Sequence, residues 1–173
     1  FKKVKHASPM LSINNAMDVN EVNAFNARCK SELGLNKEDM VEYVVEYKLD
    51  GLGISLSYEN GYLISATTRG DGQEGEDVTI NVKTIKSIPL KLMNTRNAEF
   101  SGEVRGEILM TFDEFDRINS ELQSQGKKMF ANPRNTASGT IRQYDPQVAS
   151  SRKLTAYFYD IRPSVDEYEY ATQ

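Results

Sequence analysis

The side chains best suited to chemistry stand together in Glu46-Tyr47-Lys48-Leu49-Asp50-Gly51. Side chains two positions apart on a strand point to the same side, so a strand here would gather Glu46, Lys48 and Asp50 on one face. A lysine amine becomes a nucleophile when it loses its proton. The same alternation also fits the solvated, charged face of an edge strand, where exposed charges contribute little. The hexapeptide alone leaves both interpretations open.

The composition narrows the class of protein. The 173 residues, 39% of them hydrophobic, are enough for one compact domain with a core. A net charge of −4 at pH 7 does not indicate a nucleic-acid partner for the whole chain, so any DNA contact must be local. The single cysteine, Cys29, excludes a disulfide framework and a cysteine-rich zinc site. No apolar run approaches the roughly 20 residues that span a bilayer, so we expect no membrane partner, and the single cysteine fits the reducing cytoplasm.

A helix is expected after Asp18, because Asp18 and Glu21 form a capping box. The apolar residues that follow are spaced three and four apart on one helical face, and Gly34 ends the helix. They are Val22, Phe25, Cys29 and Leu33. This spacing predicts that Cys29 lies in the core. Residues 1–17 are expected to be irregular.

The residue pattern from Met40 to Arg69 predicts strands, the first of which begins near Val44 and Val45. Apolar residues alternate with small ones from Leu52 to Tyr58. Asn60-Gly61 predicts a tight hairpin turn, since both positions need a positive φ. The segment Arg69–Glu76 contains three glycines in eight residues and is expected to be a flexible loop without regular structure.

The second half of the chain predicts a strand pair, a helix and a final strand. The strand pair is expected around Ile85–Leu92 and Glu99–Leu109. Thr111 and Glu114 form a second capping box, and the helix should bury Phe115, Ile118 and Leu122 and end at Gly126. A loop with a short helix is expected over residues 130–147, and a strand over Leu154–Ile161. The predicted fold class is α+β, with strands dominating the middle.

Lys48-Leu49-Asp50-Gly51 resembles the Lys-x-Asp-Gly signature of the covalent nucleotidyltransferases, which include DNA ligases, RNA ligases and mRNA-capping enzymes. Nearly the whole chain resembles one branch, the bacterial-type NAD-dependent DNA ligases. The matching segments occur in the same order and at similar spacing in this sequence. They are Pro9-Met10-Leu11-Ser12-Ile13, Tyr58-Glu59-Asn60-Gly61, Ala66-Thr67-Thr68-Arg69-Gly70-Asp71-Gly72, Gly75-Glu76-Asp77-Val78-Thr79, Glu103-Val104-Arg105-Gly106-Glu107 and Phe130-Ala131-Asn132-Pro133-Arg134-Asn135.

The resemblance implies that Lys48 attacks the α-phosphorus of NAD, expels nicotinamide mononucleotide and forms a lysine–AMP phosphoramidate. A free lysine amine is protonated near neutral pH, so neighbouring cations or desolvation must favour its neutral form. Asp50, the second catalytic candidate, would orient the lysine or the ribose. Mg²⁺ would neutralise the phosphates, and no residue is assigned as a metal ligand.

The resemblance also implies binding residues. Ser12 and Ile13 would lie at the nucleotide pocket, and Glu46 at the adenine end of NAD. Arg69 would contact the ribose and phosphate, and Glu107 the ribose hydroxyls, for which a carboxylate is a natural acceptor. Arg134 and Arg142 would bind phosphates of nicked duplex DNA. Without the resemblance, these residues could equally be ordinary surface charges or, for Ser12 and Ile13, part of an apolar segment packed on a core.

The resemblance implies an antiparallel or mixed-sheet nucleotidyltransferase fold, an ATP-grasp-like ligase core that is incomplete on its C-terminal side. Residues 1–173 would form a partial adenylation domain. Because later motifs have no counterpart before Gln173, we expect either a piece of a larger ligase or one subunit of a split ligase. The partners would then be the remaining ligase domains or a second subunit. Two alternatives remain: an ATP-using ligase or capping enzyme, and a non-catalytic or partner-dependent module that binds nucleotide or DNA.

Overall fold

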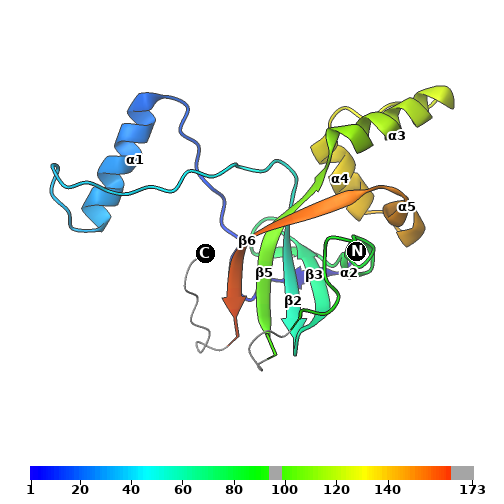
Figure 1. The fold of residues 1–173 in the computed structure, drawn as a ribbon, viewed down its shortest axis with the longest axis horizontal. Coiled ribbons are helices and arrows are strands. Elements are labelled where there is room, and N and C mark those ends of the chain that lie inside the picture. Colours follow the sequence, from blue (N-terminus) through cyan, green and yellow to red (C-terminus); the bar gives the residue numbers. More distant parts are fainter. Residues whose placement is uncertain (94–98, 165–173) are drawn as a thin grey trace. The chain divides into compact units, whose positions relative to one another are not determined.

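The computed structural model describes residues 1–93 and 99–164, drawn as a ribbon in Figure 1. The chain forms two compact units, one comprising Phe1–Met10 and Leu49–Gln173 and the other Leu11–Lys48. The first unit contains the strands and the helices from α2 onward, and the second contains helix α1. The mixture of helices with antiparallel sheets confirms the predicted α+β class.

A four-stranded antiparallel sheet with the order β3-β2-β5-β6 forms the centre of the first unit. Its core face is apolar: Ile54 and Leu56 of β2 are fully buried because alternate strand side chains point to the same face. Asn60 and Gly61 adopt φ angles of 48° and 79° between β2 and β3, which confirms the predicted hairpin. The strands are β2 (Leu52–Glu59), β3 (Tyr62–Thr68), β5 (Gly102–Met110) and β6 (Leu154–Pro163).

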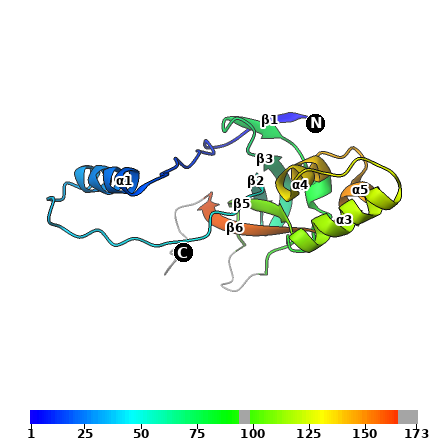
Figure 2. The same cartoon turned by 90° about the horizontal axis from the view of Figure 1, so that it is seen from above.

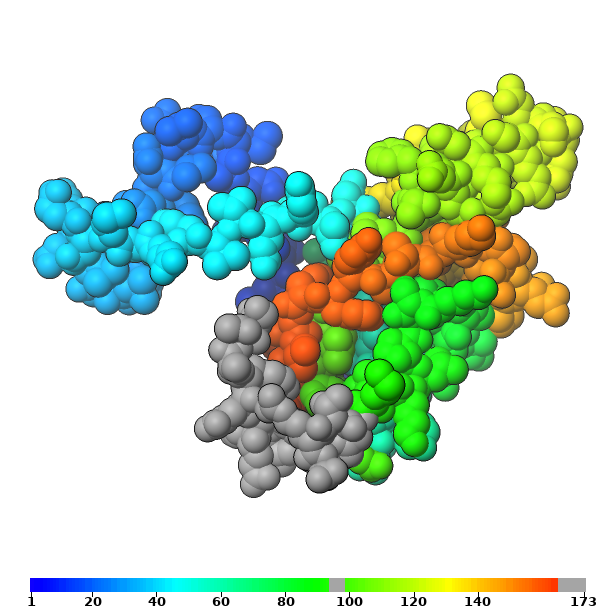
Figure 3. Space-filling model, viewed as in Figure 1, coloured from blue at the N-terminus to red at the C-terminus, as the bar shows by residue number. Residues whose placement is uncertain are grey.

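The other face of this sheet carries small and charged side chains. On β2 they follow the odd positions, and the register pairs Gly53 with Glu107 and Ser55 with Arg105 on β5. The edge strand β6, whose surface is orange in Figure 3, confirms the predicted final strand. Several of its aromatic side chains are exposed. This polar face brings together residues that are more than 50 positions apart in the sequence.

Three helices group beside the sheet, as Figure 2 shows: α3 (Phe112–Ser124), α4 (Pro133–Ile141) and α5 (Pro146–Ser151). The Thr111 side chain accepts a hydrogen bond from the Glu114 amide, which confirms Thr111 as the N-cap, whereas the Glu114 carboxylate bonds to Arg117 and to the Lys153 amide. Ile118 is buried, and Phe115 and Leu122 pack against the core as predicted. Across the described part of the chain, the helices are too short or too polar to cross a membrane.

The predicted strand over Ile85–Leu92 is wrong for most of its length, since only Lys91 pairs as β structure, in an isolated antiparallel bridge with Tyr62. After a short helix α2 (Thr79–Val82), the backbone makes successive turns, with Ile85 bonding back to Val82 and Ile88 back to Ile85. The buried residues Val82, Ile85 and Ile88 are three positions apart, a spacing that suits turns of helical character and does not suit a strand. The segment is apolar and buried as expected, but its buried residues recur every three positions and not every two.

The first ten residues also contain regular structure that the sequence did not predict. Strand β1 (Lys3–Lys5) pairs with strand β4 (Glu74–Glu76) in a separate two-stranded sheet. The expectation of an irregular start and of a structureless loop over Arg69–Glu76 is therefore wrong in both places. The two partners are about 70 residues apart, so neither contains the local signal of its pairing. The glycines at Gly70 and Gly72 still form a turn, with φ angles of 59° and 94°.

The second unit contains helix α1 (Val19–Glu32), whose N-cap Asp18 accepts a hydrogen bond from the Glu21 amide. The predicted helix and its N-cap are confirmed, although the Glu21 carboxylate accepts from the Met17 amide and not from that of Asp18. The prediction that it buries a core stripe is wrong, because no α1 residue is buried; Phe25 is 47% exposed and Cys29 is only half-buried. Amphipathic spacing shows which face of a helix can be buried, but not what covers it.

The strand expected around Lys48 is also absent. Residues 40–50 have no regular secondary structure and form no backbone–backbone hydrogen bond within the described residues. An extended chain becomes a strand only when a neighbouring strand pairs with it. The shared face predicted for Glu46, Lys48 and Asp50 therefore does not form.

Candidate functional site

Arg69 and Glu107 meet on the polar face of the sheet. Glu107 pairs with Gly53 across β5 and β2, and the Arg69 amide donates to the Gly53 carbonyl at 2.8 Å. A Cβ atom on Gly53 would lie 3.3 Å from Arg69 Cβ and 3.6 Å from Glu107 Oε2. Gly53 thus leaves room for a cationic and an anionic side chain to flank one spot. An anion and a pair of hydroxyl donors could both be recognised there.

Gly51 joins the Lys-x-Asp-Gly segment to this site. Its amide donates to Glu107 Oε1 at 3.2 Å, so the end of the motif holds the Glu107 carboxylate. A Cβ atom at Gly51 would lie 2.2 Å from the carbonyl oxygen of Ile108 and 2.6 Å from a methyl carbon of Leu109. Only glycine allows the backbone to approach β5 this closely.

Tyr159 on β6 is a neighbour that the sequence analysis did not identify. Partial burial, followed by the negative charge of Glu107, raises the pKa of the Tyr159 phenol although the side chain is 56% exposed, while the charges of Arg105 and Arg69 oppose the rise. The charges of both Arg69 and Glu107 therefore act on the Tyr159 phenol. Around it, the β5–β6 register shifts so that Arg105 faces Asp160 and Gly106 faces Phe158. An aromatic residue in the predicted strand was visible, but this irregularity was not.

Asp50 and Arg134 form an ion pair, with Arg134 Nη1 2.8 Å from Asp50 Oδ1. Arg134 lies in the first turn of α4, which Asn132 caps through the Asn135 amide. The two side chains are 73% and 57% exposed, so water screens the pair and other anions can compete for the arginine. The structure therefore brings together a catalytic candidate and a DNA-binding candidate that the sequence treated separately.

Arg142, at the C-terminal end of α4, bonds to the Glu76 carboxylate and to the Ser138 hydroxyl. It thereby connects α4 to strand β4. Its guanidinium is about one-third exposed and already has an anionic partner.

The other candidates belong to the second unit and are exposed there. Ile13 is 76% exposed, and Ser12, Glu46 and Lys48 are exposed as well. The structure thus brings Arg69, Glu107 and Asp50 into the first unit, while Lys48 is the last residue of the second. Lys48 is nevertheless only three residues from Gly51, which bonds to Glu107.

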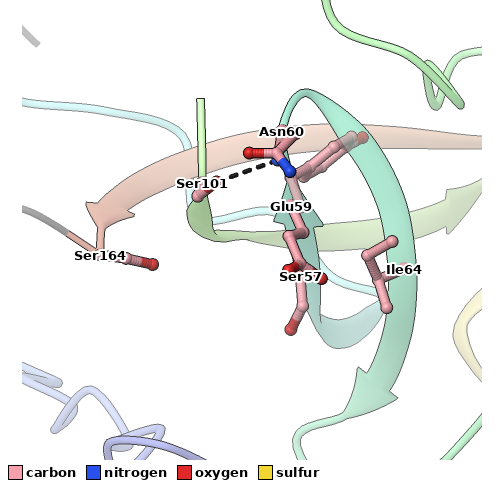
Figure 4. Close-up of a pocket in the computed structure, with 7 residues that line it drawn as sticks. Ser57, Glu59, Asn60, Ile64, Ser101 and Ser164 are labelled. Carbon is pink, nitrogen blue, oxygen red and sulfur yellow. Dashed lines mark hydrogen bonds between the residues drawn. The ribbon is translucent and has the colours of Figure 1, made fainter. Parts of the chain in front are cut away.

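A cavity of about 390 Å³ lies at the other end of β2, at the β2–β3 hairpin. Figure 4 shows its lining side chains, among them Ser57, Glu59 and Ser101, with the Asn60 amide bonded to Ser101 Oγ at 2.9 Å. Because Gly53 and Glu107 pair near the beginning of β2, this cavity is separate from the candidate site.

Among residues 1–93 and 99–164, no three His, Cys, Asp or Glu side chains are grouped to hold a metal ion. Mg²⁺ in nucleotide enzymes is commonly bound by one or two carboxylates together with substrate phosphates. The described side chains therefore do not make an all-protein magnesium site.

A mixed fold with antiparallel sheets, in which the Lys-x-Asp-Gly segment directly precedes strand β2, is consistent with an adenylation domain. The family model for the NAD-dependent DNA ligase adenylation domain matches residues 1–173. The chain belongs to that family.

Curated relatives support the assignment. The chain is 48% identical over 161 residues to a DNA ligase of Thermodesulfovibrio yellowstonii, covering 93% of this chain and 24% of that protein. It is 50% identical over 159 residues to a DNA ligase of Porphyromonas gingivalis, covering 92% and 23%. It is 49% identical over 159 residues to one of Thermotoga neapolitana, covering 92% and 22%. The chain thus spans about a quarter of the length of these relatives.

Proposed function

We propose that this chain is part of the adenylation domain of an NAD-dependent DNA ligase, and that Lys48 receives AMP. The observation that carries the proposal is the meeting of Arg69 and Glu107 at Gly53, next to the Gly51 amide that ends the Lys-x-Asp-Gly segment. Membership of the ligase adenylation family supplies the donor, NAD. In finer terms, we propose a nucleotidyltransferase fold of which residues 1–173 form a part.

In the proposed reaction, the lone pair of Lys48 Nζ attacks the α-phosphorus of NAD. A nitrogen–phosphorus bond forms, the bond to the nicotinamide mononucleotide oxygen breaks, and the amine loses a proton. Asp50 orients the lysine or the ribose. AMP then moves to the 5′-phosphate of a nick, and the 3′-hydroxyl displaces it to seal nicked duplex DNA.

The proposed nucleotide contacts follow from the chemistry of each side chain. Glu107 accepts hydrogen bonds from the ribose hydroxyls, and Arg69 binds phosphate or ribose oxygens. The Tyr159 ring, which is 56% exposed and is influenced by the charges of both residues, offers a flat apolar surface for the nucleoside. Ser12, Ile13 and Glu46 remain the proposed contacts from the second unit.

The proposed DNA contacts are Arg134 and Arg142, which would bind phosphates of the nick. Arg134 is the stronger candidate, since its partner Asp50 is exposed and its ion pair is screened. The remaining parts of the ligase, on the same or a second polypeptide, would complete the DNA-binding surface. Mg²⁺ would arrive with the phosphates of the substrate, because the described side chains form no metal cluster.

The test is intact-mass analysis of the ligase containing this chain after incubation with Mg²⁺ and either NAD or ATP. The expected result is a gain of one AMP with NAD and none with ATP. Glu107→Gln should lower the yield at limiting NAD, because a neutral amide is a weaker acceptor for ribose hydroxyls. A gain with ATP alone would indicate the ATP-using branch. Reversible NAD binding without any adduct would indicate a non-catalytic module and overturn the proposal.

A further inference from the structure

Arg105 is a buried charge for which the proposed function gives no use. It lies on β5, two residues before Glu107, and its side chain is only 3% exposed. Burying a charged group is costly unless it is fully paired, and replacing a buried ion pair by apolar residues is often neutral or stabilising. Stability alone is therefore a weak reason for an arginine at this position.

The Arg105 guanidinium is well supplied with partners. Nε and Nη2 donate to Glu103 Oε2 at 3.2 and 2.9 Å. The remaining bonds reach the N-terminal segment, nearly 100 residues earlier: Nη1 donates to the Pro9 carbonyl at 2.9 Å, and Nη2 to the Ser8 carbonyl at 2.6 Å and hydroxyl at 2.8 Å. A second arginine, Arg162 of β6, donates to the same Ser8 hydroxyl at 2.7 Å. Ser8 and Pro9 are thus held against the polar face of β5 and β6.

The held segment in turn supports the glycine-rich turn that carries Arg69. On one side of Ser8, the His6 ring nitrogen Nε2 lies 3.1 Å from the Arg69 carbonyl oxygen, to which it donates. On the other side, the buried Met10 donates its amide to the Gly72 carbonyl at 2.9 Å. The turn is therefore fixed at both ends by this segment, which is held at its beginning by the β1–β4 pairing and at Ser8 and Pro9 by Arg105, with Arg162 also bonding to Ser8.

The geometry points to Arg105 as a positioning residue for NAD binding. This inference rests on the proposed function. Through Ser8 and Pro9, Arg105 sets the position of the Arg69 turn, and through β5 it is rigidly connected to Glu107, the other half of the pair at Gly53. The segment it holds leads directly to Ser12 and Ile13. Arg105 touches none of the proposed reacting atoms, so it acts through these residues.

The guanidinium shape matters as well as its charge. Arginine presents several N–H donors in a fixed plane, which lets one side chain bond at once to a carboxylate and to two successive backbone carbonyls. Lysine has a single nitrogen and cannot reproduce this arrangement. Arg105→Lys therefore keeps the positive charge and removes the simultaneous bonds to Glu103, Ser8 and Pro9.

The test compares Arg105→Lys with the parent ligase in the rate of adduct formation over a range of NAD concentrations. We expect the KM for NAD to rise at least about tenfold with a much smaller change in kcat, because ground-state nucleotide contacts are misplaced. Sealing of a nick that already carries AMP should change less. Arg117→Lys is the matched control, since Arg117 pairs with the buried Glu114 carboxylate away from this face. Its KM for NAD should equal that of the parent.

Ser8→Ala keeps the test decisive if Arg105→Lys does not fold. It removes the hydroxyl shared by Arg105 and Arg162 and leaves the backbone bonds in place. It should raise the KM for NAD about two- to threefold. An unchanged KM for NAD in Ser8→Ala, or in a folded Arg105→Lys, would overturn the inference. If the parent itself forms no adduct, the proposed function fails instead, so the two failures are distinguishable.

Discussion

Replacing Gly51 by alanine tests the close approach on which the candidate site depends. The added Cβ would lie 2.2 Å from the Ile108 carbonyl oxygen, about 1 Å inside the ~3.3 Å of a close carbon–oxygen contact. Overpacking of this kind costs about 1–3 kcal/mol. Moving the backbone of residue 51 away from β5 also weakens its partly buried hydrogen bond to Glu107, which adds about 1 kcal/mol to the destabilisation. The net destabilisation should be about 1.5–3.5 kcal/mol, after subtraction of the roughly 0.5 kcal/mol by which alanine restricts the unfolded chain.

Urea unfolding followed by far-UV circular dichroism measures this change, since the chain has no tryptophan. With a urea m-value of about 2 kcal/mol per M, the midpoint should fall by about 1 M. Gly139→Ala in α4 is the matched control, because nothing lies within 4 Å of its added Cβ and alanine favours a helix by about 0.5–1 kcal/mol. Its midpoint should rise. A Gly51→Ala midpoint equal to that of the parent would refute the reasoning.

Two further predictions concern charged pairs. Glu114, 4% exposed, accepts two bonds from Arg117, and these bonds, ahead of the others, lower its pKa. The stability that Glu114 contributes is therefore complete above the ordinary carboxyl pKa of 4.5 and is lost as the pH falls through the lower pKa of the folded state. Glu114→Gln should cost about 1–3 kcal/mol of stability at pH 7 and should make Tm fall less steeply as the pH is lowered. A pH dependence of Tm equal to that of the parent would contradict this. Arg134→Gln should leave stability within about 0.5 kcal/mol, because its ion pair with Asp50 is exposed, and should reduce the salt slope of nicked-DNA binding by about 0.9. An unchanged slope in a fluorescence-anisotropy titration would remove Arg134 from the DNA surface.

Features encoded within a few residues were predictable. Asn60-Gly61 specifies its turn through its own backbone preferences, and the capping residues Asp18 and Thr111 bond to amides three positions away. Such signals depend on no distant partner. The predictions based on them are confirmed.

Features that depend on distant partners were not predictable. Strand β1 exists because β4 pairs with it, and α1 shows an apolar face without an indication of what covers it. The family resemblance named Arg69 and Glu107, but their meeting at Gly53 follows from the pairing of β2 with β5 on one side and with β3 on the other. The β5–β6 pairing is irregular at Tyr159, whose phenol is influenced by the charges of Glu107 and Arg69. A single sequence contains no local sign of either register.

Peptide mass mapping of the NAD-treated ligase tests the central claim most directly. After incubation with NAD and Mg²⁺, the account predicts one AMP on the peptide that contains Lys48, its complete loss in Lys48→Ala, and its retention in Lys37→Ala, which removes another exposed lysine of the same unit. AMP on a different residue, or an undiminished adduct in Lys48→Ala, would contradict the assignment of Lys48 as the nucleophile.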